Sequence, residues 1–173
     1  GWGKVLDELE QHLGEAPFAG ELMGIFRRAY HEQDTLAGAT RALAHALFGE
    51  EGLVIIGGDD PILKREMIPY FQEELLEQPT KQRVEETSQS LEKTYHRQVH
   101  PREINLFHLR PGHRARLLRE GKRWQTADGA REWDQETLLK ELRENPEHFS
   151  PNALLRPLYQ EVLLPNLAYI GGG

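Results

Sequence analysis

Two short apolar runs that end in glycines constrain the fold of this chain most strongly. Leu53–Ile56 leads into Gly57-Gly58, and residues 166–170 lead into the triglycine at 171–173. A continuous apolar run of this length is typical of a strand buried on both faces of a parallel sheet. Glycines after such a strand let the backbone approach an anionic ligand closely. The sequence therefore predicts an α/β fold in which strand ends form a site for negatively charged ligands.

Composition restricts the class of protein further. The chain has 173 residues, no cysteine and a net charge of −7. The length fits one domain, or a core with a small insertion. No disulfide scaffold is possible, no apolar run reaches the roughly 20 residues that span a bilayer, and no global basic field attracts nucleic acid. We expect a cytoplasmic protein without membrane or nucleic-acid partners. The glycine start and the stop at a glycine loop predict a piece of a longer enzyme.

Four segments are expected along the chain. Residues 1–50 show three helical apolar stripes, and residues 51–103 read as an α/β core unit with a right-handed crossover. Residues 104–130 change to short alternating strands, with a hairpin around Glu120-Gly121, and predict a small antiparallel insertion at the edge of the parallel sheet. Residues 131–173 predict helices and a last core strand that ends in the glycine loop.

The segment 149–160 is the densest in polar groups suited to an anion. Ser150 is expected to cap a helix whose first turn holds Pro151, and the free N–H groups of that turn favour negative charge. Asn152, Arg156 and Gln160 recur at intervals of four, so they share one helix face. An arginine and amides beside a helix end predict carboxylate or phosphate binding. The alternative is a capped connecting helix with Arg156 in a structural ion pair.

A second candidate group precedes the first strand of the meander. Pro101 biases His100 toward an extended conformation, so its imidazole can project from the end of the sheet. His100 is then a candidate acid or base near neutral pH, with Arg102 as an anion clamp and Asn105 close behind. The alternative is a loop histidine followed by a surface pair of Arg102 with Glu103.

Other polar clusters give weaker predictions. Asp59 and Asp60 follow the first glycines, where they predict a helix cap, a magnesium ligand or an ammonium contact. No metal site is expected from histidine spacing, and the basic hairpin reads as a solvated ribbon, with an RNA surface as the alternative. The histidines concerned are His96, His108, His113 and His148, and the basic residues are Arg114, Arg116, Lys122 and Arg123.

Several segments together are similar to one family. In chain order they are residues 53–60, 74–79, 99–107 and 149–173, and they resemble the bacillithiol-biosynthesis cysteine-adding enzymes, also described as cysteine ligases. The resemblance implies a partial Rossmann-like core with connecting-peptide insertions. It also implies a longer parent protein that dimerises through a C-terminal coiled coil. The isolated piece is then expected to be inactive.

The resemblance also implies a reaction. The family's chemistry is addition of L-cysteine to glucosaminyl malate through an amide bond, for which a nucleotide (ATP or ADP) is the expected activating cofactor. We therefore predict a catalytic set and a substrate-binding set. The catalytic set is His100, Arg102 and Arg156; the substrate-binding set is Asn105, Ser150, Asn152, Gln160, Gly171, Gly172, Gly173 and Asp59. The alternative function is a nucleotide-binding or scaffolding α/β module without its own catalysis.

Overall fold

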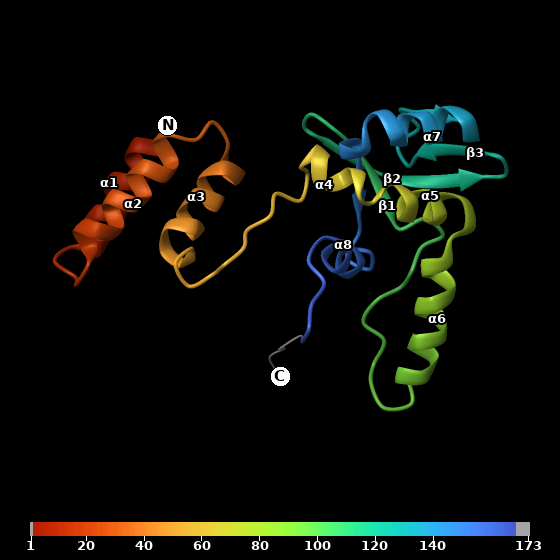
Figure 1. Ribbon diagram of the computed structural model, residues 1–173, viewed down its shortest axis with the longest axis horizontal. Helices are drawn as coiled ribbons and strands as arrows, with labels where there is room; N and C mark the ends of the chain where they lie inside the picture. The colour runs from red at the N-terminus through yellow and green to blue at the C-terminus, as the bar shows by residue number, and fades with distance from the viewer. Residues whose placement is uncertain (1, 169–173) are drawn as a thin grey trace. The chain divides into compact units, whose positions relative to one another are not determined.

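A computed structural model describes residues 2–168, which divide into two compact units on either side of the boundary between Gly57 and Gly58 (Figure 1). No helix in the described range combines the length and apolarity needed to cross a bilayer.

The first unit consists of three helices, as expected from the apolar stripes. Their bounds are α1 (Trp2–Leu13), α2 (Ala19–His31) and α3 (Leu36–Phe48). The rings of Trp2 and Tyr30 lie 4.9 Å apart, so the start of α1 meets the end of α2. The Thr35 side chain caps α3 by accepting a hydrogen bond from the Gly38 N–H at 3.0 Å. The small core of this unit contains Leu6, Met23, Ala29 and Ala39.

The second unit is built on a five-stranded sheet with the order β4-β3-β2-β1-β5, and every neighbouring pair is antiparallel. The hairpin around Glu120-Gly121 is confirmed, since Glu120 faces Arg123 and Gly121 has a positive φ of 62° that suits glycine. The strand bounds are β1 (Leu106–Arg110), β2 (His113–Glu120), β3 (Arg123–Thr126), β4 (Glu132–Trp133) and β5 (Phe149–Pro151).

One face of this sheet is buried and the other is more exposed. In β2 only Ala115 and Leu117 are buried, in alternation with exposed or half-buried neighbours, as expected for a half-buried antiparallel strand. The register places buried partners opposite one another, for example Leu106 beside Pro151 and His108 beside Phe149. The half-buried Phe107 and exposed Arg116 face each other on the opposite side.

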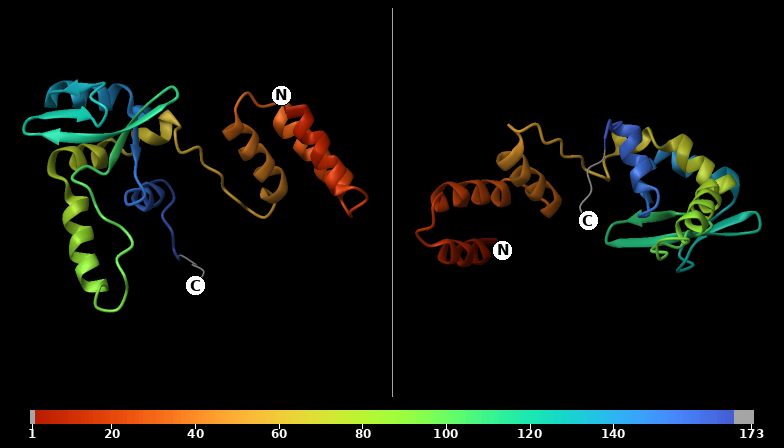
Figure 2. Two further views of the ribbon diagram at one scale, coloured as in Figure 1. Left: turned by 180° about the vertical axis from the view of Figure 1, so that it is seen from behind. Right: turned by 90° about the horizontal axis from the view of Figure 1, so that it is seen from below.

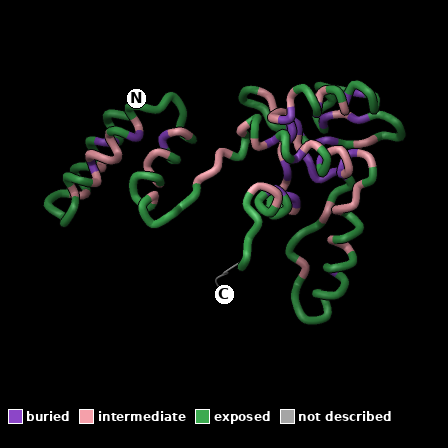
Figure 3. Tube along the Cα trace, viewed as in Figure 1, coloured by how far each residue is buried: buried purple, intermediate pink, exposed green. Residues whose placement is uncertain are grey.

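Helices cover the buried face and complete the core (Figure 3). Trp124 of β3 is 1% exposed, and its indole N–H donates to the Leu75 carbonyl at 3.0 Å, which ties the sheet to α5. Helix α6 projects away from the sheet in Figure 1 and in the left view of Figure 2. The helical bounds are α4 (Pro61–Arg65), α5 (Ile68–Glu77), α6 (Pro79–Leu91), α7 (Gln135–Glu144), the 3₁₀ turn η1 (Pro146–His148) and α8 (Arg156–Leu163).

The parallel sheet that the apolar runs predict is not found among residues 2–168. Leu53–Ile56 has no regular secondary structure, and the Leu53 and Val54 side chains are 46% and 66% exposed. A strand needs a neighbour for its N–H and C=O groups, and no described segment pairs with this run. Residues 166–168 are also irregular, and the rest of the expected last strand lies outside the described residues. The meander therefore pairs with β5 instead of bordering a parallel sheet.

Candidate functional site

Asn105 is the centre of a buried hydrogen-bond network at the start of β1. Its side chain is 1% exposed. Asn105 Oδ1 accepts from the Arg102 N–H at 3.1 Å and from Asn152 Nδ2 at 2.8 Å. Asn105 Nδ2 donates to the Arg102 carbonyl and to Glu74 Oε1, both at 2.9 Å. These four bonds use the capacity of the amide, so Asn105 orients the loop that carries Arg102.

Glu74 joins this network from α5, and sequence reasoning missed it. Its carboxylate is 1% exposed and also accepts from the Asn105 backbone N–H at 2.9 Å and from Thr80 Oγ1 at 2.6 Å. Several donors therefore compensate the burial of this charged group. Glu74 sits beside Leu75 in an apolar helix pattern, and nothing in that pattern distinguishes it from the solvent-facing glutamates around it.

Ser150 does not cap a helix, contrary to the sequence prediction. It lies in β5 opposite Phe107 and precedes α8 by several residues. Asn152 instead closes the turn before α8, since its Oδ1 accepts from the N–H groups of Leu154 at 2.9 Å and Leu155 at 3.2 Å, and α8 itself begins without a side-chain cap. The reason is that Phe149 and Pro151 are buried against β1, which extends the chain past Ser150. Asn152 thus links the turn before α8 to Asn105.

The other predicted site residues lie outside this network. His100, Arg156 and Gln160 are exposed. Within residues 2–168 no hydrogen bond or ion pair joins their side chains to Asn105 or Asn152, and none pairs Arg156 with a carboxylate. The contacts of the described residues do not test the catalytic and substrate-binding roles predicted for these three residues, so the roles stay predictions. The triglycine Gly171, Gly172 and Gly173 lies outside the described residues.

Arg102 borders a pocket of about 300 Å³ beside β2. In this pocket Arg119 is already engaged, because its guanidinium donates to the Leu76 carbonyl at 2.9 Å and lies over the Trp124 ring. Arg102 and Arg116 have no ion-pair partner among residues 2–168. Guanidinium groups bind carboxylates and phosphates with paired N–H donors. The pocket lining is Arg102, Glu103, Ile104, Arg116, Leu117, Leu118, Arg119 and Glu120.

Lys64 of α4 is a second functional candidate that the sequence did not reveal. Its side chain is fully buried, and its ammonium donates a hydrogen bond to the Phe149 carbonyl of β5. Burial lowers the pKa of Lys64 from 10.5 to about 8, against the opposing charge of Asp59, whose carboxylate oxygen lies 3.8 Å from Nζ. A buried lysine with a depressed pKa is more frequent at functional sites than elsewhere.

The loop before α4 carries two carboxylates, Asp59 and Asp60, and the Asp60 carboxylate accepts hydrogen bonds from backbone N–H groups. Asp60 caps α4 by accepting from the N–H groups of Ile62 at 2.8 Å and Leu63 at 3.4 Å, which confirms the helix-cap prediction. Asp59 is 78% exposed and lies beside Lys64, which is the one ammonium contact found for it in the described chain.

The buried hydroxyl of Tyr159 in α8 has no hydrogen-bond partner among residues 2–168, and burial raises the pKa of this hydroxyl.

The family model described as "Bacillithiol biosynthesis BshC, N-terminal Rossmann-like domain" matches residues 1–173. The match covers the whole of the sequence, so it places the chain in a class of domains that this family model describes. Proteins named "Putative cysteine ligase BshC" align with the chain at 45% identity over 173 residues in Flavobacterium johnsoniae and 41% over 174 residues in Christiangramia forsetii, each covering 100% of this chain and 32% of the relative. In Salinibacter ruber the identity is 34% over 172 residues, covering 97% and 31%.

The chain belongs to the BshC family, as the sequence resemblance indicated. It spans about a third of the length of these curated relatives. The described sheet is antiparallel, so the Rossmann-like description is a property of the family model and not of the strands in residues 2–168.

Proposed function

We propose that the whole protein containing this chain joins the carboxyl group of L-cysteine to the amine of glucosaminyl malate, in bacillithiol biosynthesis. The observation that supports this proposal is the family match over residues 1–173, together with relatives named as cysteine ligases at 41–45% identity. Because the chain spans about a third of those relatives, the activity is proposed for the whole protein. We propose that it works in the cytoplasm as a homodimer.

The chemistry of the acceptor suits the arginine pocket. Malate that is linked to a sugar through its hydroxyl keeps two carboxylates, and Arg102 and Arg116 line one pocket of about 300 Å³. We assign the acceptor carboxylates to these two guanidinium groups. The loop of Arg102 is held by Asn105, so the pocket wall is fixed before ligand binds. His100, exposed two residues before Arg102, is the proposed acceptor of the amine proton.

Amide formation also needs an activated carboxyl group. A bound nucleotide such as ATP would supply this activation by making one oxygen of the cysteine carboxylate part of a phosphate-bearing leaving group. Within residues 2–168 the Gly57-Gly58 loop does not fit a phosphate, because the carboxylates of Asp59 and Asp60 follow it directly. We therefore assign none of the described residues to the nucleotide.

Replacing Arg102 with glutamine in the whole protein is expected to lower kcat/KM for glucosaminyl malate by about 10- to 100-fold, mainly through a higher KM, because a charge-assisted contact to carboxylate is lost. The measurement is thiol analysis of the product at varied acceptor concentration. The matched control is Arg83→Gln, an exposed arginine on α6, which should keep the wild-type KM. An unchanged KM in Arg102→Gln would remove the acceptor from this pocket.

The two other proposed catalytic residues are tested in the same assay. Wild-type product levels from both His100→Ala and Arg156→Ala would refute their assignment. Calorimetric titration of the whole protein with ATP, ADP, cysteine and glucosaminyl malate separates the ligase from a module that binds nucleotide alone. Binding of nucleotide without any response to the amino sugar would favour the module.

A further inference from the structure

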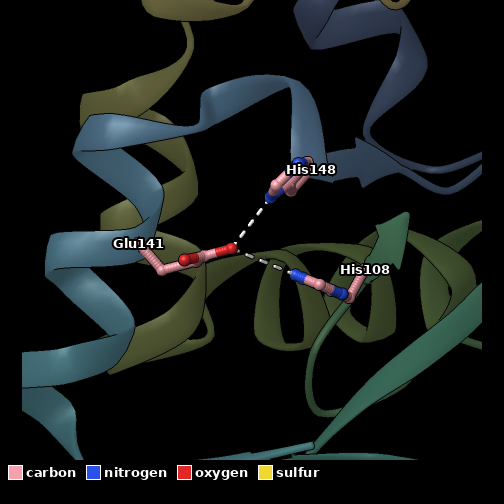
Figure 4. A group of neighbouring side chains, drawn as sticks. All are labelled: His108, Glu141 and His148. Carbon is pink, nitrogen blue, oxygen red and sulfur yellow. Dashed lines mark hydrogen bonds and ion pairs between the residues drawn. The ribbon is translucent and has the colours of Figure 1, made fainter. Parts of the chain in front are cut away.

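His108, Glu141 and His148 come together from three elements of the second unit. His108 lies in β1, Glu141 in α7 and His148 in η1. Figure 4 shows one carboxylate oxygen of Glu141 between the two imidazoles. Glu141 Oε1 lies 2.8 Å from His148 Nδ1 and 3.6 Å from His108 Nε2. One donor atom from each residue falls within 4.8 Å of the others.

The His108 imidazole is buried, and one of its two ring nitrogens, Nε2, is unpaired within residues 2–168. Its side chain is 2% exposed, and Nε2 has no hydrogen-bond partner among residues 2–168, because 3.6 Å is too long for a hydrogen bond. The ring is packed against Trp133 and Phe149, with centroids 5.0 and 5.6 Å away, so it cannot easily turn toward another partner. An unpaired nitrogen aimed at a carboxylate and a second imidazole indicates a ligand between them.

Charge and donor chemistry indicate which ligand fits. A metal ligand must offer a free lone pair, and the unpaired Nε2 of His108 lies 3.6 Å from Glu141 Oε1. Two imidazole nitrogens and one carboxylate oxygen suit Zn²⁺ and similar transition metals, whereas Mg²⁺ and Ca²⁺ prefer oxygen ligands alone. The guanidinium of Arg131 lies 3.6 Å from Glu141 Oε1, and its side chain is 41% exposed, so it can turn into solvent.

We propose that His108, Glu141 and His148 bind a divalent transition-metal ion, Zn²⁺, with a water molecule as the fourth ligand. Donor atoms around tetrahedral zinc lie about 3.3 Å apart for bonds of roughly 2.0 Å. The His108–Glu141 distance of 3.6 Å is near that value, and the His148–Glu141 distance of 2.8 Å must increase slightly. His148, 37% exposed, has the room to move. The ion would fasten β1 to α7 and η1.

This site was not expected from the sequence, in which no histidine spacing indicated a metal. His108 and Glu141 are far apart in the chain, and His148 follows Glu141 across the break at Pro146. Only the packing of α7 and η1 against β1 brings the three donors together. The inference is independent of the proposed ligase reaction, since it uses none of the residues assigned there.

The test is metal binding by the whole, tag-free protein after chelator treatment. Isothermal titration with Zn²⁺ should show a site that is lost in His148→Ala and weakened at least about 100-fold in Glu141→Gln. Titration with Co²⁺ should give the ligand-field absorption of a tetrahedral nitrogen–oxygen site in the wild type. His96→Ala, which removes an exposed histidine outside the cluster, should keep the full stoichiometry and the spectrum.

The outcomes separate the metal site from a hydrogen-bonded cluster. Loss of one Zn²⁺ equivalent and of the Co²⁺ spectrum in His148→Ala, with an unchanged circular dichroism spectrum, supports the proposal. If the wild type binds no Zn²⁺, or if His148→Ala retains every equivalent and the Co²⁺ spectrum, the proposal is overturned. His148 is at the rim of the cluster, so this variant keeps the buried His108 packing. Should the variant lose its fold, Glu141→Gln provides the same comparison.

Discussion

Replacing Glu74 with glutamine is expected to destabilise the region around Asn105 by about 3 kcal/mol, because breaking a buried charged hydrogen-bond network leaves desolvated groups unpaired. Glutamine has only one amide oxygen, so its NH2 group would replace either Oε1, which accepts from Asn105, or Oε2, which accepts from Thr80. Local opening that involves the loop before β1 should then become about 100-fold more frequent. Hydrogen exchange of the whole protein, followed by mass spectrometry, measures this at residues 102–106.

The matched control for Glu74→Gln is Glu77→Gln, an exposed position at the end of the same helix. It changes charge by the same amount, so any general electrostatic effect appears in both variants. Faster exchange at residues 102–106 in Glu74→Gln alone assigns the effect to the buried network. Equal exchange in the two variants would mean that Glu74 does not hold the Arg102 loop.

The wild type is expected to become more stable as the pH rises above 8, and Lys64→Met is expected to abolish this rise. The pKa of Lys64 is about 8 in the folded chain and 10.5 in its ordinary environment. Below pH 8 both states carry the proton, and the burial cost of the ammonium is constant. Between pH 8 and 10.5 the unfolded state binds more protons, so the free energy of unfolding rises with pH. From pH 8 to 9.5 the rise is about 2 kcal/mol at about 1.4 kcal/mol per pKa unit.

The measurement is the thermal midpoint of the whole protein at several pH values between 7.5 and 9.5, compared between wild type and variant. The series stops at 9.5 because the pKa of Tyr159 is raised above 10.0 by burial, and its contribution is lost at higher pH. Lys93→Met, at an exposed lysine, is the control and should follow the wild type. Parallel pH curves for wild type and Lys64→Met would contradict the depressed pKa of Lys64.

Local patterns predicted the local structure well. The alternation on both sides of Glu120-Gly121 predicted the hairpin, because a two-residue turn and one buried face are properties of neighbouring residues. Asp60 before Pro61 predicted the cap of α4 for the same reason. Segments that extend over most of the chain carried the family resemblance, which the family model confirms.

Features that depend on distant partners could not be predicted. Leu53–Ile56 has the composition of a buried strand, but among residues 2–168 no neighbour pairs with it. Ser150 looked like a helix cap because Pro151 follows it, whereas pairing with β1 makes it part of a strand. Lys64 reads as an ordinary charged residue of a short helix. Its burial depends on the Phe149 carbonyl, which is contributed by a segment far along the chain.

The two outermost strands of the sheet are also its shortest. β4 has two residues and β5 has three, and the Lys64 ammonium donates to the Phe149 carbonyl of β5. A long, exposed edge strand offers unpaired N–H and C=O groups with which another polypeptide can pair, whereas a short or covered edge strand offers few. Lateral growth of the sheet by backbone pairing is therefore disfavoured on both sides. Attachments between this unit and other polypeptide segments are expected to use side chains.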